Sequence, residues 1–156
     1  MEIIDVNGIN EARRQIDKLH AHGKEIIVVA KDMDFNRKIL ENKKIDVLLF
    51  SGYFGNRKKL KQRDSGLNHI LCRIAKENGI SIGINFSDFL GKDSFKLSEL
   101  LSSTMQNIRL CRKFGVKILI FNTAGRDKSE ITSFFLTLGM QNPIIKNLDK
   151  KSLLMF

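Results

Sequence analysis

The residues whose types and spacing are best suited to binding a ligand form a dense basic run in the first half of the chain. Five cations fall within seven positions, at Arg57, Lys58, Lys59, Lys61 and Arg63. Lysine and arginine side chains at this density neutralise phosphate groups and displace the counterions of a polyanion. A run of like charge can equally be a solvated surface loop without a ligand. The spacing by itself therefore leaves both interpretations open.

The stretch after the basic run has the pattern of an amphipathic helix. Apolar residues recur at helical spacing before a terminating Gly79, which predicts a buried stripe at Leu67, Ile70, Leu71 and Ile74. Asp64 is expected to cap this helix. The outward side is expected to carry Ser65, His69, Cys72, Arg73 and Lys76. His69 and Arg73 would then face solvent beside the basic run.

The whole chain carries an excess of positive charge. Its formal net charge is +10 and its pI is near 9.8. Such an excess attracts polyanions, and nucleic acid is the commonest intracellular one. The alternative is a lysine-rich surface that serves solubility alone. Arg126 and Lys128, which follow a later apolar run, could extend the basic patch.

Short apolar runs rich in β-branched residues alternate with amphipathic stretches. They predict five strands, at Glu2–Val6, Glu25–Ala30, Ile45–Phe50, Ile80–Phe86 and Val116–Phe121. Continuous apolar strands that alternate with helices are typical of a parallel α/β sheet covered on both faces. The basic run follows the third strand, so it should project from the carboxyl edge of the sheet, where α/β folds assemble their sites.

Two helix starts can be predicted from local signals. Asn10 is expected to cap the first helix. Asn142 and Pro143 are expected to start a short last helix, because proline is tolerated in the first turn.

The length of the chain limits the number of domains and the number of strands that it can form. With 156 residues, the chain is expected to form a single domain over residues 1–156. A complete (β/α)8 barrel takes about 250 residues, so five strands fit either an open sheet or a partial barrel. Cys72 and Cys111 are expected to be reduced thiols in a cytoplasmic protein, because no apolar run suits an export signal or a membrane span.

A stand-alone metal-dependent phosphoesterase is one alternative function. Such an enzyme needs histidines and carboxylates at the carboxyl ends of its strands. His20 and His22 instead end a helix at the opposite edge, and Asp32, Asp34 and Asp88 are explained as helix caps or loop residues. We therefore predict no catalytic residue, metal ligand or cofactor site. A protein-interaction module, whose basic run faces an acidic partner, is the other alternative.

Several stretches of the chain resemble ribonuclease P protein component 3, an archaeal relative of a barrel subunit of eukaryotic ribonuclease P and MRP. The most specific is Gln-Arg-Asp-Ser-Gly-Leu-Asn-His-Ile-Leu at residues 62–71. It is followed by the matching strand at 80–85, the Phe-Asn-Thr-Ala sequence at 121–124 and Leu-Gly-Met at 138–140. The resemblance implies a partial or shortened TIM-like barrel, related to the polymerase-and-histidinol-phosphatase hydrolases.

The same resemblance implies a role in a ribonucleoprotein that removes the 5′ leader from precursor tRNA. The RNA component would hold the catalytic Mg2+ ions. Ribonuclease P RNA, precursor tRNA, protein component 2 and the other ribonuclease P proteins would be the partners. No membrane is implied.

The expected RNA contacts combine the basic run with nearby outward-facing residues. They are Arg57, Lys58, Lys59, Lys61, Arg63, His69, Arg73, Arg126 and Lys128. Asp64, Ser65, Gly66 and Asn68 are expected to shape the loop that presents the run, Asn68 by bonding Asp64 or a backbone carbonyl.

Overall fold

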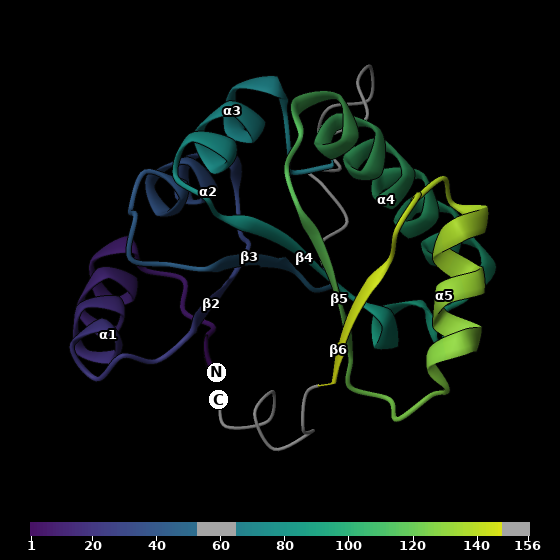
Figure 1. Cartoon of the computed structure of the whole chain (residues 1–156), viewed down its shortest axis with the longest axis horizontal. Coiled ribbons are helices and arrows are strands. Elements are labelled where there is room, and N and C mark those ends of the chain that lie inside the picture. The colour runs from purple at the N-terminus through teal and green to yellow at the C-terminus, as the bar shows by residue number, and fades with distance from the viewer. Residues whose placement is uncertain (53–64, 148–156) are drawn as a thin grey trace.

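The computed structural model describes residues 1–52 and 65–147, in which strands and helices alternate (Figure 1). The strands are β1 Glu2–Ile4, β2 Ile26–Val29, β3 Val47–Phe50, β4 Ser81–Asn85, β5 Ile118–Asn122 and β6 Ile144–Asn147. The helices are α1 Ile9–Ala21, α2 Met33–Leu40, α3 His69–Glu77, α4 Ser94–Phe114 and α5 Lys128–Thr137. A 3-10 turn, η1 Phe86–Phe89, follows β4.

The sheet is parallel, and its strands lie side by side in the order in which they occur in the chain, β1-β2-β3-β4-β5-β6. It curls, with the helices along its outer side (Figure 1). Sequential parallel βα units of this kind build TIM barrels. The described residues therefore form a curled half-barrel, and the predicted α/β class with a partial barrel is confirmed.

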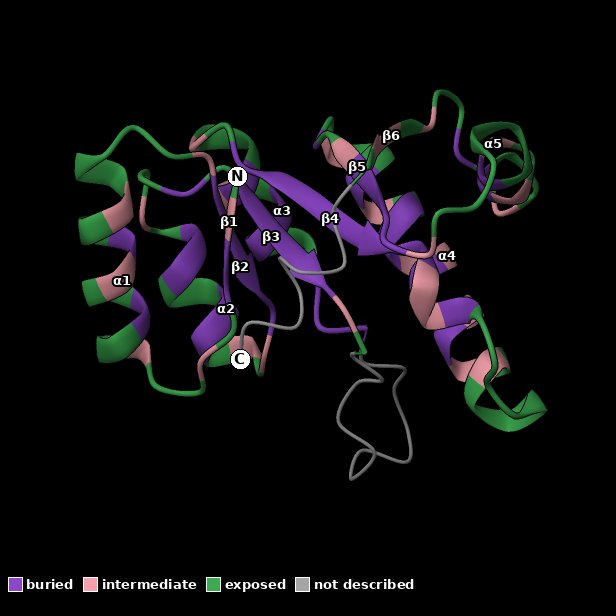
Figure 2. Cartoon of the chain, turned by 90° about the horizontal axis from the view of Figure 1, so that it is seen from below, coloured by how far each residue is buried: buried purple, intermediate pink, exposed green. Residues whose placement is uncertain are grey.

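Alternate side chains of the strands face two different environments. Ile26 and Val28 of β2 pack with residues of the outer helices. The other set forms a cluster of strand residues alone, comprising Ile3, Ile27, Val29, Val47, Leu49, Leu119 and Phe121. All of them are buried, and the strands β1 to β5 are buried along most of their length, whereas the edge strand β6 is partly exposed (Figure 2). The inner face of the half-barrel is thus densely packed.

Gly83 of β4 is where this inner packing is tightest. A Cβ atom at Gly83 would lie 2.9 Å from Phe121 Cε2 and 3.0 Å from both Leu49 Cδ1 and Val47 Cγ1. A side chain at this position would force these neighbouring side chains to shift. The ring of Phe121 therefore occupies the space that any other residue would need.

An ion pair connects two strands that are far apart in the sequence. Lys146 Nζ of β6 lies 2.7 Å from Oε1 of Glu25, the residue before β2. Because strand side chains alternate, both residues fall on the same side of the sheet as the inner cluster. Each side chain is about one-third exposed, at 34% and 36%.

The local predictions for the segment after Pro143 and for the start of the first helix are wrong. The segment after Pro143 is the strand β6 and not a helix, because Ile144 and Ile145 pair with Leu119 and Ile120 of β5. Proline fits directly before an edge strand, where its missing N–H breaks no ladder. Helix α1 begins earlier than expected, after Gly8, and no side chain caps it.

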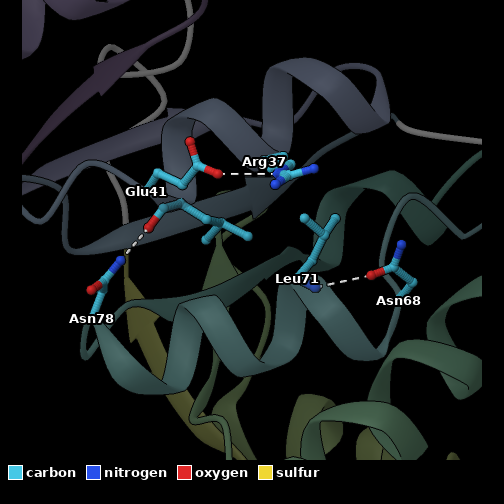
Figure 3. A network of polar contacts seen from close by, with 6 residues as sticks. Arg37, Glu41, Asn68, Leu71 and Asn78 are labelled. Atoms are coloured by element: carbon cyan, nitrogen blue, oxygen red, sulfur yellow. Dashed lines mark hydrogen bonds and ion pairs between the residues drawn. The ribbon is translucent and has the colours of Figure 1, made fainter.

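Helix α3 begins at His69, and its cap is Asn68, so the expected helix start after Asp64 is wrong. Asn68 Oδ1 accepts a hydrogen bond of 2.9 Å from the Leu71 backbone N–H (Figure 3). At the other end of the helix, Asn78 Nδ2 donates to the Leu40 carbonyl oxygen at 2.7 Å (Figure 3). The helix is thereby held at both ends, once by its own cap and once by α2.

The predicted phase of α3 is only partly right. His69, Arg73 and Lys76 are exposed, as expected. Cys72 is fully buried and Ile70 is 49% exposed, the reverse of the prediction. Ser65 is also buried, and it lies before the helix. The buried face is Leu71, Cys72 and Ala75.

Cys72 explains part of this rotation. A hydrogen bond links its thiol to that of Cys111 in α4, and both side chains are fully buried. This bond and the burial raise the pKa of the Cys111 thiol far above its ordinary range. Both cysteines are free thiols, in agreement with the prediction. They act as small apolar residues between the two helices.

Candidate nucleic-acid interface

The basic run itself lies outside the described residues, as does Asp64. The prediction that Arg57, Lys58, Lys59, Lys61 and Arg63 contact RNA therefore stays a prediction from sequence. The structure does describe the two points where the chain enters and leaves this segment, Gly52 and Ser65.

Hydrogen bonds fix both of these points. The Gly52 backbone N–H donates to Asp88 Oδ2 at 2.8 Å. On the other side, the Ser65 carbonyl accepts from Asn107 Nδ2 of α4 at 3.3 Å, and the Gly66 carbonyl accepts from Asn36 Nδ2 of α2 at 3.4 Å. The Ser65 hydroxyl donates to the Leu67 carbonyl at 3.4 Å. The segment with the basic run thus starts and ends at anchored positions of the carboxyl edge.

A polar network occupies the carboxyl edge of the sheet. Asn85 Nδ2 donates to Ser51 Oγ and to Asp88 Oδ1, both at 3.3 Å. Thr123 Oγ1 donates to Asn85 Oδ1 at 3.0 Å and is also hydrogen-bonded to the Ser87 hydroxyl. The network joins the ends of β3, β4 and β5. It lines this edge with polar side chains that are hydrogen-bonded to one another.

Ser51, Asn85 and Thr123 are not among the site residues predicted from the sequence. A signal was present, since Asn85 ends β4, and the polar residues Ser51 and Thr123 directly follow β3 and β5. The carboxyl ends of neighbouring parallel strands meet at one edge of the sheet, so these residues had to lie close together. Asp88, interpreted as a cap or loop residue, lies in η1 and bonds across to β3.

Arg126 is held at the same edge by its backbone. Its N–H donates to Asn122 Oδ1 at 3.2 Å, and its carbonyl accepts from Asn122 Nδ2 at 2.8 Å. Arg126 and Lys128 are both exposed. Within the described contacts neither forms an ion pair, so both charges are available to an external anion.

His69 and Arg73 lie on the exposed side of α3. His69 is at the first position of the helix, near the carboxyl edge. Arg73 lies one turn further on and leans toward α4, where its Cζ is 5.7 Å from the centroid of the Phe114 ring. The structure therefore associates Arg73 with α4 rather than with the loops that carry Arg126.

Within the described ranges, no group of three His, Cys, Asp or Glu side chains is arranged to hold a metal ion. His20 and His22 are exposed at the end of α1, and His22 Nδ1 lies 2.7 Å from the Lys18 carbonyl oxygen. Asp32 caps α2 by accepting from the Phe35 N–H at 2.8 Å. No helix among residues 1–52 and 65–147 is long and apolar enough to cross a membrane.

These features define a class of protein: a parallel α/β half-barrel of the TIM type with a polar carboxyl edge. No protein-family model matches the chain. Curated relatives do match it, and they are named ribonuclease P protein component 3. The Methanococcus maripaludis (strain C7) protein is 26% identical over 78% of this chain and 49% of its own length. The Methanocaldococcus jannaschii protein is 24% identical over 97% and 62%. That of Methanosarcina acetivorans is 32% identical over 74% and 42%.

A solved structure also has a fold similar to that of this chain. A chain in the cryo-EM structure of archaeal ribonuclease P with mature tRNA superposes with a TM-score of 0.72, at 24% identity. The match covers 88% of this chain and 59% of that one. The chain is thus a homologue of ribonuclease P protein component 3. It spans about half the length of the curated relatives it matches.

Proposed function

We propose that the chain is a protein subunit of ribonuclease P, which assists a catalytic RNA in removing the 5′ leader from precursor tRNA. The observation that carries the proposal is the similarity of 24% to 32% to proteins named ribonuclease P protein component 3. The match to a chain of an archaeal ribonuclease P structure supports it through the fold.

In this proposal the cations of the chain hold RNA phosphates and perform no chemistry. The contacts are Arg57, Lys58, Lys59, Lys61, Arg63, His69, Arg73, Arg126 and Lys128. Such contacts position the RNA and do not discriminate between bases. The RNA component holds the Mg2+ ions, and this chain binds no cofactor and has no catalytic residue.

The residues around the run have a supporting role. Asp64, Ser65, Gly66 and Asn68 shape the segment that presents the cations. The bonds made by the Ser65 and Gly66 carbonyls and by the Asn68 cap support this role. Protein component 2, the other ribonuclease P proteins and precursor tRNA are the partners, and the complex works in the cytoplasm without a membrane.

Cleavage of precursor tRNA tests the proposal. Ribonuclease P RNA is assayed with component 2 and with or without this chain, over a range of salt concentrations. We expect the chain to accelerate cleavage and to have no activity alone. Arg57, Lys59, Lys61 and Arg63→Ala together should remove most of the acceleration at elevated salt, because each lost phosphate contact weakens binding.

A variant of equal charge provides the control. Arg13, Arg14, Lys18 and Lys38 are exposed on α1 and α2, and their replacement by alanine should leave the acceleration intact. Cleavage by the chain alone would instead indicate a phosphoesterase. Acceleration that survives the first quadruple variant would indicate a protein-interaction module. No acceleration by the wild-type chain would refute the proposal.

A further inference from the structure

A second concentration of positive charge lies on the outer helices, away from the carboxyl-edge loops. Residues 69–78 and 105–117 contain six cations and one carboxylate, Glu77. The cations are Arg73, Lys76, Arg109, Arg112, Lys113 and Lys117. These two short segments therefore carry five of the ten net positive charges of the chain. Helices α3 and α4, to which most of them belong, pack side by side (Figure 1).

Carboxylates do not compensate this charge. Elsewhere Lys24, Lys31, Arg37, Lys44, Lys96 and Lys146 each pair with an acidic side chain. None of the six cations on α3, α4 and the following turn forms an ion pair within the described part of the chain. Lys76 has a structural explanation, because its ammonium group lies beside Gly115 at the C-terminus of α4, where the helix dipole favours a cation.

Two of the remaining cations converge on one aromatic ring. Arg73 Cζ lies 5.7 Å and Lys113 Nζ 5.8 Å from the centroid of the Phe114 ring. The ring attracts each cation, but it also brings two like charges together from different helices. An anion bound beside the ring would be attracted by both cations. This geometry suits a phosphate or a carboxylate group.

A cavity of about 550 Å³ extends along the same side of α4. Its described lining comprises Ser102, Met105, Gln106, Arg109, Leu110 and Lys113. Four of these six residues are polar, at helical positions i, i+4, i+7 and i+11. They form one stripe about 17 Å long on the helix. We name Arg73, Ser102, Gln106, Arg109 and Lys113 the α3–α4 stripe.

We infer that the α3–α4 stripe binds the sugar–phosphate backbone of RNA, as a contact surface additional to the basic run and Arg126. Serine, glutamine, arginine and lysine are side chains that contact nucleic-acid phosphates. An acidic protein partner is less favoured, because four of the six lining residues are polar or basic and only Met105 and Leu110 could serve as apolar anchors for a protein interface. The inference rests on the proposed function, since it adds a second contact for the same RNA.

Binding of an RNA hairpin of about 20 base pairs, measured against salt concentration, tests the inference. Arg109 and Lys113→Gln together should weaken binding about fivefold or more at low salt, and Arg73, already a contact in the proposed function, is left unchanged. The slope of log affinity against log salt should flatten by about 1.5 units, because each lost phosphate contact contributes roughly 0.7 to 0.9. The matched control is Arg13 and Arg14→Gln, which changes the charge equally on the exposed face of α1.

The outcomes separate this inference from the proposed function. Weaker binding and a flatter slope in the stripe variant alone support the stripe, provided that both variants keep the wild-type thermal transition. Equal effects in the stripe and control variants mean that only net charge matters, which overturns the stripe. If the stripe variant does not fold, Lys113→Glu alone must weaken binding more than Lys18→Glu, or the inference fails. If the wild-type chain binds no RNA, the proposed function fails with it.

Discussion

Asp88 joins two segments of the carboxyl edge through a single carboxylate. Oδ2 accepts from the Gly52 N–H and Oδ1 from Asn85 Nδ2. Burial raises the pKa of Asp88 above its ordinary value of 3.8, because removal from water disfavours the charged form. Hydrogen bonds from Gly52 and Ser51 and the charge of Lys92 oppose this effect without cancelling it. The hydrogen bonds of the carboxylate therefore connect the two segments, while the burial of its charged form lowers the free energy of unfolding.

Asp88→Asn should remove one source of pH dependence in the free energy of unfolding. Asp88 binds its proton more tightly in the folded chain than in the unfolded one. Its contribution is therefore fully present below pH 3.8 and is lost as the pH rises through the raised folded pKa. We expect the stability of the variant relative to wild type to increase as the pH rises above about 3.8 and through the raised folded pKa. Urea unfolding at several pH values measures this difference.

Asp34→Asn controls for the loss of one negative charge, because Asp34 is exposed in the first turn of α2. Its difference from wild type should not follow the trend of Asp88→Asn. Matching trends in the two variants would mean that net charge, and not the burial of Asp88, causes the pH dependence.

The part of the candidate site that could be predicted from the sequence is the exposure of single charged or polar residues, because exposure follows from residue type. His69, Arg73, Arg126 and Lys128 are exposed cations or polar residues, as their types suggest. The meeting of Ser51, Asn85 and Thr123 at one edge could have been predicted from where the strands end, whereas the individual hydrogen bonds of Asn85 depend on the register of three strands. The pairing of Arg73 with the Phe114 ring likewise depends on how two helices pack.

Among the elements, the five predicted strands are present because long apolar runs identify buried parallel strands. β6 was missed because its four residues are too few to show a period, and its strand conformation depends on pairing with β5. The rotation of α3 was missed for a related reason. Helical periodicity places Ile70 in the buried stripe and Cys72 outside it, and only packing against the neighbouring α4 shows that Cys72 is the buried residue.

Gly83→Ala should test how tightly the inner face of the sheet is packed. The added methyl group would meet Phe121, Leu49 and Val47 at 3.0 Å or less. We expect a loss of about 1–3 kcal/mol in the free energy of unfolding, measured by chemical denaturation. Gly8→Ala is the control, since the nearest atom to its new Cβ, Glu11 Cβ, is 3.9 Å away. Similar losses in both variants would argue against a packed inner face.

For the molecule as a whole, the half-barrel has two edge strands among the described residues, β1 and β6. The Glu25–Lys146 ion pair links the region next to one edge with the other edge. If packing of the inner cluster holds the curl, this ion pair should contribute little. If the curl depends on the ion pair, removing the pair should lower the free energy of unfolding substantially.

A double-mutant cycle of Glu25→Gln and Lys146→Met distinguishes these two cases. Because both side chains are about one-third exposed, solvent screens their attraction, and we expect a coupling free energy of at most about 1 kcal/mol. Thermal or urea unfolding of the four proteins gives the coupling. A coupling above about 2 kcal/mol would show that the ion pair maintains the curvature.

The sequential strand order also bears on how the chain acquires its structure during synthesis. Val28 pairs with Leu48 and Ile82 with Ile118, so a strand meets a partner 20 or 36 residues away in these pairs. From β2 onward, each described strand leaves the ribosome when its earlier neighbour is already available. The sheet can therefore grow one βα unit at a time from its N-terminal edge, and no described strand other than β1 has to wait for its first partner.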